Sequence, residues 1–147
     1  MSTTTTESEV TTETEATAAF ADRIMDATLG WMDLMAVHLG SQLGWYAELS
    51  RADGLTADEL AERTHTDARY AREWLEQQCA TGILRADEDA DPAARRFRLG
   101  PGVAEVLLDR GSLSYLEPLA RMMAASGTQI DALLDAYRTG GGVSWEQ

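Results

Sequence analysis

Two histidines and one cysteine are the residues of this chain with the most evident potential for chemistry. His38 and His65 fall in different predicted elements, and neither has a second ligand at a spacing typical of a metal site. Cys79 is the single cysteine, which excludes an intrachain disulfide, and no activating base lies near it in the sequence. We therefore expect no metal site, no catalytic residue and a buried structural thiol.

An acidic run at residues 87–91 has the alternating carboxylates of a calcium-binding loop. The sixth position of such a loop requires glycine and the twelfth requires a bidentate glutamate. This chain has Pro92 and Arg98 at those positions, which excludes an EF-hand. The run is expected to be a solvated loop tip.

Three consecutive glycines at 140–142 suggest a phosphate-binding turn by composition only. A dinucleotide-binding turn follows a strand and opens a helix. No strand is predicted before these glycines, and the five residues after them cannot form the helix. We expect no cofactor-binding residue here, and interpret the glycines as a hinge or loop.

The elements that position these residues begin with a long helical region. Residues 1–18 are predicted to form a disordered acidic tail, because Ser, Thr and Glu dominate them. Apolar spacing from Phe20 to Leu49 predicts helix with a wide apolar face, interrupted at Gly30. Gly40 and Gly44 predict the close approach of another backbone. The face is too wide for one small core and predicts packing against a second copy; the alternative is that later helices of this chain cover it.

Residues 55–99 predict two helices followed by two strands. Thr56 and Glu59 have the spacing of a capping box, Asp67 suits the start of a second helix, and Gly82 suits its end. Strands are expected at 83–86 and 96–99. This order predicts a mainly α fold: a winged helix-turn-helix with a two-stranded β wing and flanking helices. Further helices are expected around 103–108, 115–125 and 130–137. The predicted inner stripe of the second helix comprises Tyr70, Ala71, Trp74, Leu75, Gln78 and Cys79.

The charge of the chain restricts its partners. It has 147 residues, with 12 arginines, no lysine and a net charge of −13. DNA affinity comes mostly from cations meeting phosphate, and the predicted helix pair carries an excess of acids, so DNA binding is disfavoured. No apolar run approaches the ~20 residues of a membrane span, which predicts no membrane association. The N-terminus has no signal-peptide pattern, so a cytoplasmic location is expected.

Three segments carry a resemblance to a known family: residues 39–49, residues 55–64 continuing into 68–75, and residues 138–143. They resemble the N-terminal winged-helix dimerisation domain of class I S-adenosylmethionine-dependent methyltransferases of the small-molecule type. The resemblance implies a domain that dimerises and helps to wall the substrate pocket. It also implies that S-adenosylmethionine binds in a following Rossmann-like catalytic domain, which is absent from this chain. His65 stands where the resemblance leads us to expect glycine, which predicts strain if φ is positive.

These expectations define three segments and one candidate pocket. The segments are the tail at 1–18, a winged-helix domain with dimerisation helices at 19–138, and a Gly-rich linker to the missing catalytic domain at 139–147. A homodimer is expected through residues 20–49, with a small-molecule substrate in the complete enzyme and no activity in this chain alone. The alternative is a stand-alone DNA-binding transcriptional regulator. The candidate substrate-pocket residues are Trp31, Met35, His38 and Trp145.

Overall fold

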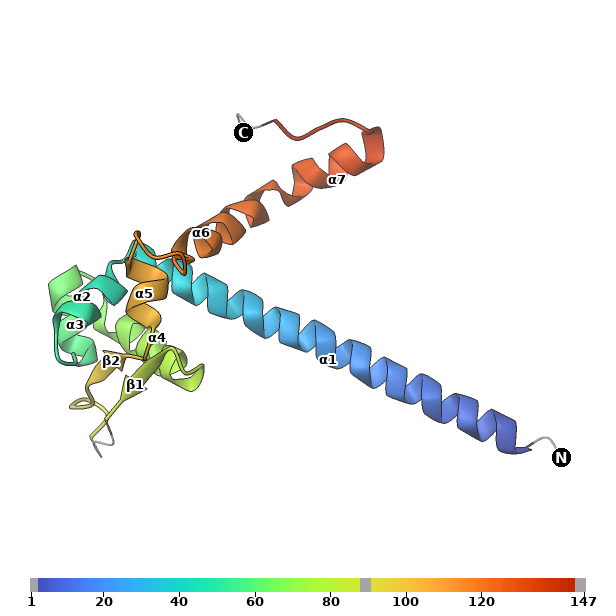
Figure 1. Ribbon diagram of the computed structural model, residues 1–147, viewed down its shortest axis with the longest axis horizontal. Helices are drawn as coiled ribbons and strands as arrows, with labels where there is room; N and C mark the ends of the chain where they lie inside the picture. The colour runs from blue at the N-terminus through green and yellow to red at the C-terminus, as the bar shows by residue number, and fades with distance from the viewer. Residues whose placement is uncertain (1–2, 88–90, 145–147) are drawn as a thin grey trace. The chain divides into compact units, whose positions relative to one another are not determined.

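The computed structural model describes residues 3–87 and 91–144, with side chains from residue 12 onward (Figure 1). It divides into two compact units, Met1–Asp33 and Leu34–Gln147, which are taken in turn. None of the helices in the described part is long and apolar enough to cross a membrane.

In the described residues, the N-terminal unit consists of the first part of helix α1 (Thr3–Gln42). Residues 3–18 are helical, so the structure differs from the expected disordered tail. Extending an existing helix adds one hydrogen bond per residue without a new nucleus, which accounts for this continuation. The predicted break at Gly30 is also wrong, because a glycine costs a helix only about 1 kcal/mol relative to alanine. The segment boundaries at 18 and 138 remain a prediction.

The actual break between the first two helices lies at Gly44. α1 ends at Gln42, and α2 (Trp45–Arg51) begins after Gly44, whose φ is +73°. Only glycine adopts this left-handed conformation at little cost, so Gly44 reverses the chain where Gly30 does not.

The helix-turn-helix consists of α3 (Ala57–Thr64) and α4 (Ala68–Ala80). The predicted capping box is confirmed: the Glu59 amide donates to Thr56 Oγ1 over 3.2 Å, and the Thr56 amide donates to Glu59 Oε2 over 3.0 Å. Asp67 caps α4 as predicted, accepting from the Arg69 amide over 2.9 Å. Side chains local in sequence thus fix where both helices start.

The turn between α3 and α4 places His65 in the left-handed region, with φ 56° and ψ 42°. The Thr66 amide donates to the Ala61 carbonyl over 3.0 Å, and the His65 amide donates to the Glu62 carbonyl over 3.4 Å. This pair of bonds is the Schellman motif, in which the left-handed position is usually glycine. His65 therefore has the positive φ for which backbone strain is predicted.

The wing is an antiparallel pair, β1 (Leu84–Ala86) and β2 (Phe97–Leu99), in which Leu84 lies opposite Leu99. Each strand begins one residue later than predicted. Leu55 extends the pairing, because it exchanges two backbone hydrogen bonds of 3.1 and 2.8 Å with Phe97. The start of the helix-turn-helix is thereby joined to the wing.

Three helices follow the wing, as predicted: α5 (Val103–Leu108), α6 (Glu117–Ser126) and α7 (Ile130–Thr139). A 3₁₀ turn, η1 (Gly127–Gln129), connects α6 to α7. Gly140, at φ +74°, ends α7 by donating its amide to the Ala136 carbonyl over 2.9 Å.

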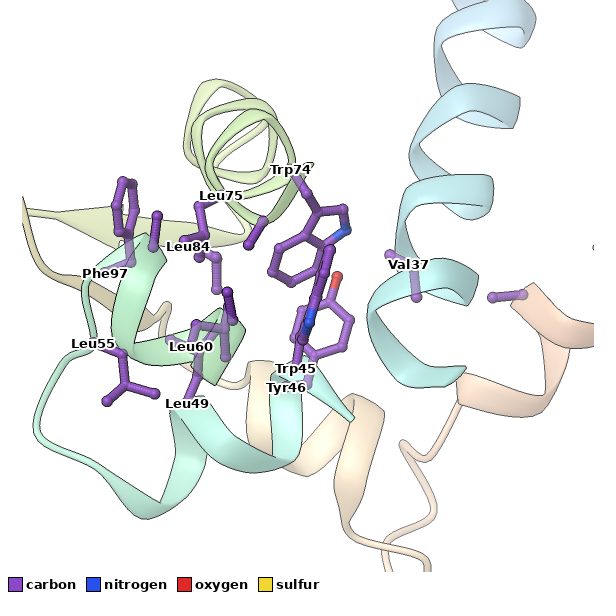
Figure 2. Packing of buried hydrophobic residues seen from close by; sticks show 14 residues of the cluster. Val37, Trp45, Tyr46, Leu49, Leu55, Leu60, Trp74, Leu75, Leu84 and Phe97 are labelled. Carbon is purple, nitrogen blue, oxygen red and sulfur yellow. The ribbon is translucent and has the colours of Figure 1, made fainter. Parts of the chain in front are cut away.

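The core lies between the helix-turn-helix, the wing and the end of α1 (Figure 2). Trp74 and Leu75 are buried, as predicted, but Tyr70 is 61% exposed, so the prediction that it lies on the inner stripe is wrong. The inner stripe of α4 starts instead at Ala71 and continues one helical turn on through Trp74 and Leu75. The buried apolar residues are Val37, Trp45, Tyr46, Leu49, Leu55, Ala57, Leu60, Ala61, Ala71, Trp74, Leu75, Leu84, Phe97 and Ala120.

Candidate functional site

An aromatic cluster, formed by Trp45, Tyr46 and Trp74, fixes the last turns of α1 against α4 (Figure 2). Nε1 of Trp74 donates to the Ala36 carbonyl over 2.8 Å. A Cβ on Gly40 would overlap Cζ2 of Trp74 and lie 2.8 Å from Cε2 of Tyr46. The close approach predicted at Gly40 therefore exists, but its partner is a pair of aromatic rings and not another backbone.

The predicted pocket residues do not form one described site. Met35 and His38 are both half-buried on the last part of α1. Nδ1 of His38 is buried, and no described residue offers it a hydrogen-bond partner. Trp31 belongs to the N-terminal unit, where its side chain is exposed, and Trp145 lies outside the described residues. A role for these four residues in a substrate pocket stays a prediction.

Cys79 is half-buried and not fully buried as expected. Burial raises the pKa of the Cys79 thiol, and the nearby carboxylate of Glu76 raises it further. A raised pKa keeps the sulfur as a neutral thiol at neutral pH, which is the form that is inert as a nucleophile. Across the described side chains, no group of three or more His, Cys, Asp and Glu is placed to hold a metal ion.

The outward face of α4 carries few free cations. Arg69 stacks its guanidinium 4.6 Å from the ring centroid of Tyr70, and both side chains are exposed. Arg72 lies 3.7 Å from a carboxylate oxygen of Asp58, and Arg63 of α3 lies 4.0 Å from Glu48. A nucleic acid on this face would meet these carboxylates as well as the arginines.

Three of the four arginines of the wing are also paired within the chain, and Arg85 of β1 is the exception among the described residues. Arg95 lies 2.8 Å from Glu76, and Arg98 lies 3.1 Å from Asp53. Arg96 contacts Glu59 at 2.9 Å and also donates to the Gly54 carbonyl over 2.9 Å. Exposed ion pairs are individually weak, about 0–1 kcal/mol, so their main effect here is to leave the wing without excess positive charge.

A hollow of about 250 Å³ lies within the C-terminal unit, between the end of α1, α2, α5 and the start of α6. Sequence reasoning missed it, because no spacing along the chain indicates that residues from four segments converge. The only sequence signal is the presence of two arginines, Arg110 and Arg121, in an acidic chain. The lining residues are Ser41, Gln42, Tyr46, Ala47, Leu107, Leu108, Arg110, Tyr115, Glu117 and Arg121.

The helix-turn-helix, the two-stranded wing and the flanking helices define a winged helix-turn-helix domain. Residues 31–108, more than half of the chain, match the family model described as the Rv2258c-like winged HTH domain. The chain belongs to this family. No curated protein sequence matches it.

Solved structures with the same fold include human N-acetylserotonin methyltransferase in complex with SAM. That match has a TM-score of 0.64 and 19% identity, and it covers 82% of this chain and 35% of the other. PigF with SAH matches with a TM-score of 0.59 and 19% identity, covering 84% of this chain and 38% of the other. Staphylococcus aureus MarR in complex with salicylate and kanamycin matches more weakly, with a TM-score of 0.41 and 14% identity over 90% of this chain and 83% of the other. This chain spans little more than a third of the length of the first two structures.

Proposed function

We propose that this chain is the N-terminal dimerisation and substrate-capping domain of a small-molecule methyltransferase that uses S-adenosylmethionine. The observation that carries the proposal is the match to two longer chains, solved with SAM and SAH, over more than four fifths of this chain. In such an enzyme this domain provides walls that orient the acceptor and exclude water, while the transfer itself occurs on a separate domain. Met35 and His38, together with Trp31 and Trp145, are the proposed wall residues.

Exposed apolar side chains on α1 support the dimerisation part of the proposal. Leu29 and Met32 are 53% and 58% exposed, and neither belongs to the hydrophobic core or to the residues packed against it. Their helical positions place them on one face of the helix, with Arg23 and Ala27 on the opposite face. Exposed apolar surface of this extent marks an interaction site in a protein that stays in solution. The proposed occupant is the same face of a second copy.

Cofactor binding tests the proposal that the SAM site lies on a separate domain. Isothermal titration of SAM into the 147-residue chain is expected to give no binding heat, because the cofactor belongs to a separate domain. The product of the natural gene, read to its own stop codon, is expected to be longer and to bind SAM. Tight SAM binding by the 147-residue chain, or a gene that ends at codon 147, would contradict the proposal.

Light scattering after size exclusion tests the dimer. At roughly tens of micromolar the chain is expected to have twice its monomer mass, and Leu29→Arg with Met32→Arg is expected to give a monomer. Ala27→Arg is the matched control, because it places the same side chain on the opposite side of the helix at another exposed position. Circular dichroism checks that all variants keep their helix content. A monomeric parent chain, or a dimer that survives the double substitution, would contradict this interface.

A DNA-binding regulator is the second candidate function. The exposed Arg69–Tyr70 pair at the start of α4 is the observation that favours it, because the helix following the tight turn is the one that enters the major groove in helix-turn-helix proteins. The carboxylates beside the other arginines oppose it. A gel shift with random duplex at low salt separates the two functions: we expect no retardation, whereas retardation that weakens steeply with salt would favour the regulator.

A further inference from the structure

The hollow within the C-terminal unit is polar over most of its lining, although it lies among apolar helices. Its apolar side consists of Ala47, Leu107 and Leu108. Its polar side chains come from the end of α1, from the segment after α5 and from the first turns of α6. These polar residues are Ser41, Gln42, Arg110, Tyr115, Glu117 and Arg121.

Two of the lining residues are arginines without an ion-pair partner in the described part of the chain. Seven other arginines lie within 4.0 Å of a carboxylate oxygen of this chain. Arg110 and Arg121 make no such pair among the described residues, and neither do Arg23, Arg69 and Arg85, although acidic residues outnumber arginines 25 to 12. The hollow therefore brings together two exposed arginines out of the five that have no carboxylate partner in the described part of the chain.

A buried hydroxyl adds a second, independent feature. Oγ of Ser41 is inaccessible to solvent and has no hydrogen-bond partner among the described residues. Ser41 is therefore a lining residue whose hydroxyl, a donor and an acceptor, is left unsatisfied by the described part of the chain. Glu117, by contrast, already accepts a hydrogen bond from the Tyr115 hydroxyl over 3.1 Å.

Charge balance selects the class of ligand. The two arginines and Glu117 together give one net positive charge, which a monoanion neutralises and a phosphate dianion exceeds. The planar guanidinium fork matches a carboxylate with two parallel hydrogen bonds. The volume of about 250 Å³ is below the ~300 Å³ at which drug-sized pockets begin, so the ligand is small.

We propose that this hollow is a binding site for a small monocarboxylate. Arg110 and Arg121 hold the carboxylate, while Glu117 accepts a hydrogen bond from a hydroxyl or ammonium group of the same ligand. The proposal is independent of the methyltransferase assignment, because every lining residue belongs to this chain and the test needs no cofactor.

Protein-observed NMR of the 147-residue chain tests the proposal, with L-lactate as the probe and L-lactamide as its neutral counterpart. Lactate up to about 10 mM, a range suited to a ligand of so few atoms, is expected to give saturable shifts of backbone amides in residues 41–47 and 107–121. Arg110→Gln and Arg121→Gln are each expected to weaken binding about tenfold or more. Arg85→Gln is the matched control, because Arg85 is an exposed arginine of β1, and it is expected to leave the affinity unchanged.

Three outcomes would overturn the proposal. Lactamide that shifts the same amides equally would show that the charge is not recognised. Lactate shifts that persist in both Arg→Gln variants, or that are absent from the parent chain, would show that the hollow is not the site. Inorganic phosphate that binds more tightly than lactate would overturn the choice of a monocarboxylate.

Discussion

Nε1 of Trp74 donates a hydrogen bond to the backbone carbonyl of Ala36, and this bond ties the helix-turn-helix to the last turns of α1. The indole reaches that carbonyl because Gly40, one turn later on α1, has no side chain in the way. The carbonyl oxygen has two lone pairs, so it accepts from the indole in addition to its helical partner. The contact therefore requires glycine at position 40 of α1, although glycine disfavours helix formation.

Gly40→Ala is expected to destabilise the fold by about 1–3 kcal/mol, because the new Cβ overlaps the Trp74 ring. The cost of this overlap exceeds the gain in helix propensity. Gly30→Ala is the matched substitution in the same helix, since no atom lies within 4 Å of the added Cβ. It is expected to raise helix content instead. Urea unfolding and far-ultraviolet circular dichroism measure the two effects; equal effects at both positions would refute the packing argument.

The buried pair Tyr46 and Gln78 gives a second prediction. The Tyr46 hydroxyl donates to Oε1 of Gln78, and both side chains have no exposed surface. Tyr46→Phe is expected to cost about 1–3 kcal/mol, because it leaves a buried amide oxygen without that donor.

The double variant Tyr46→Phe with Gln78→Leu is expected to cost less than the sum of the two single substitutions, because it removes both partners together. Urea unfolding of all four proteins in the cycle measures the coupling. Strict additivity would mean that this hydrogen bond does not contribute to stability.

The turn at His65 is predicted to be improved by glycine. His65→Gly is expected to stabilise the domain by about 0.5–1 kcal/mol, since the left-handed conformation costs a side-chain-bearing residue about 1–2 kcal/mol. His65→Ala serves as the control, because it removes the imidazole but keeps the Cβ that causes the strain. Thermal unfolding compares them; a gain with alanine as large as that with glycine would place the cause in the imidazole instead.

The capping box is expected to make part of the stability depend on pH. The hydrogen bond from the Thr56 amide holds the pKa of Glu59 below its usual value, burial partly opposes this, and the charge of Arg96 adds to the lowering. Because the folded-state pKa is depressed, the contribution is present above the unfolded-state pKa and is lost as pH falls through the folded-state pKa.

Glu59→Gln keeps an acceptor for the Thr56 amide but removes the charge. Its stability is therefore expected to fall below that of the parent at neutral pH and to approach it in acid. Urea unfolding between about pH 3 and pH 7 measures the difference. A difference that stays constant over this range would exclude a role for the Glu59 charge.

The parts of the fold that could be predicted from the sequence depend on neighbours a few residues apart. The capping box of Thr56 and Glu59, the cap at Asp67 and the terminating Gly82 all act within one turn, so residue type and spacing are sufficient evidence. The family resemblance, and not local spacing, identified His65 as the unusual residue of the turn. The order of these signals was enough to predict the winged helix-turn-helix.

Features that depend on distant contacts could not be predicted in the same way. Tyr70 and Trp74 lie one turn apart on α4, yet Tyr70 is exposed and Trp74 is buried. Apolar periodicity alone does not show how far around the helix the buried face extends. The partner of Gly40 lies more than thirty residues away in the chain, in Trp74. The hollow around Arg110 and Arg121 requires α1, α2, α5 and α6 to converge, which no local pattern encodes.

The exposed apolar side chains of α1 also affect how the stability of this protein is measured. Burial that is gained only through association enters the unfolding equilibrium by mass action. Under the proposed pairing of two copies, the midpoint of thermal unfolding rises with protein concentration, whereas the Leu29→Arg and Met32→Arg variant melts at one temperature at every dilution. For this chain, a melting temperature quoted without a concentration is incomplete.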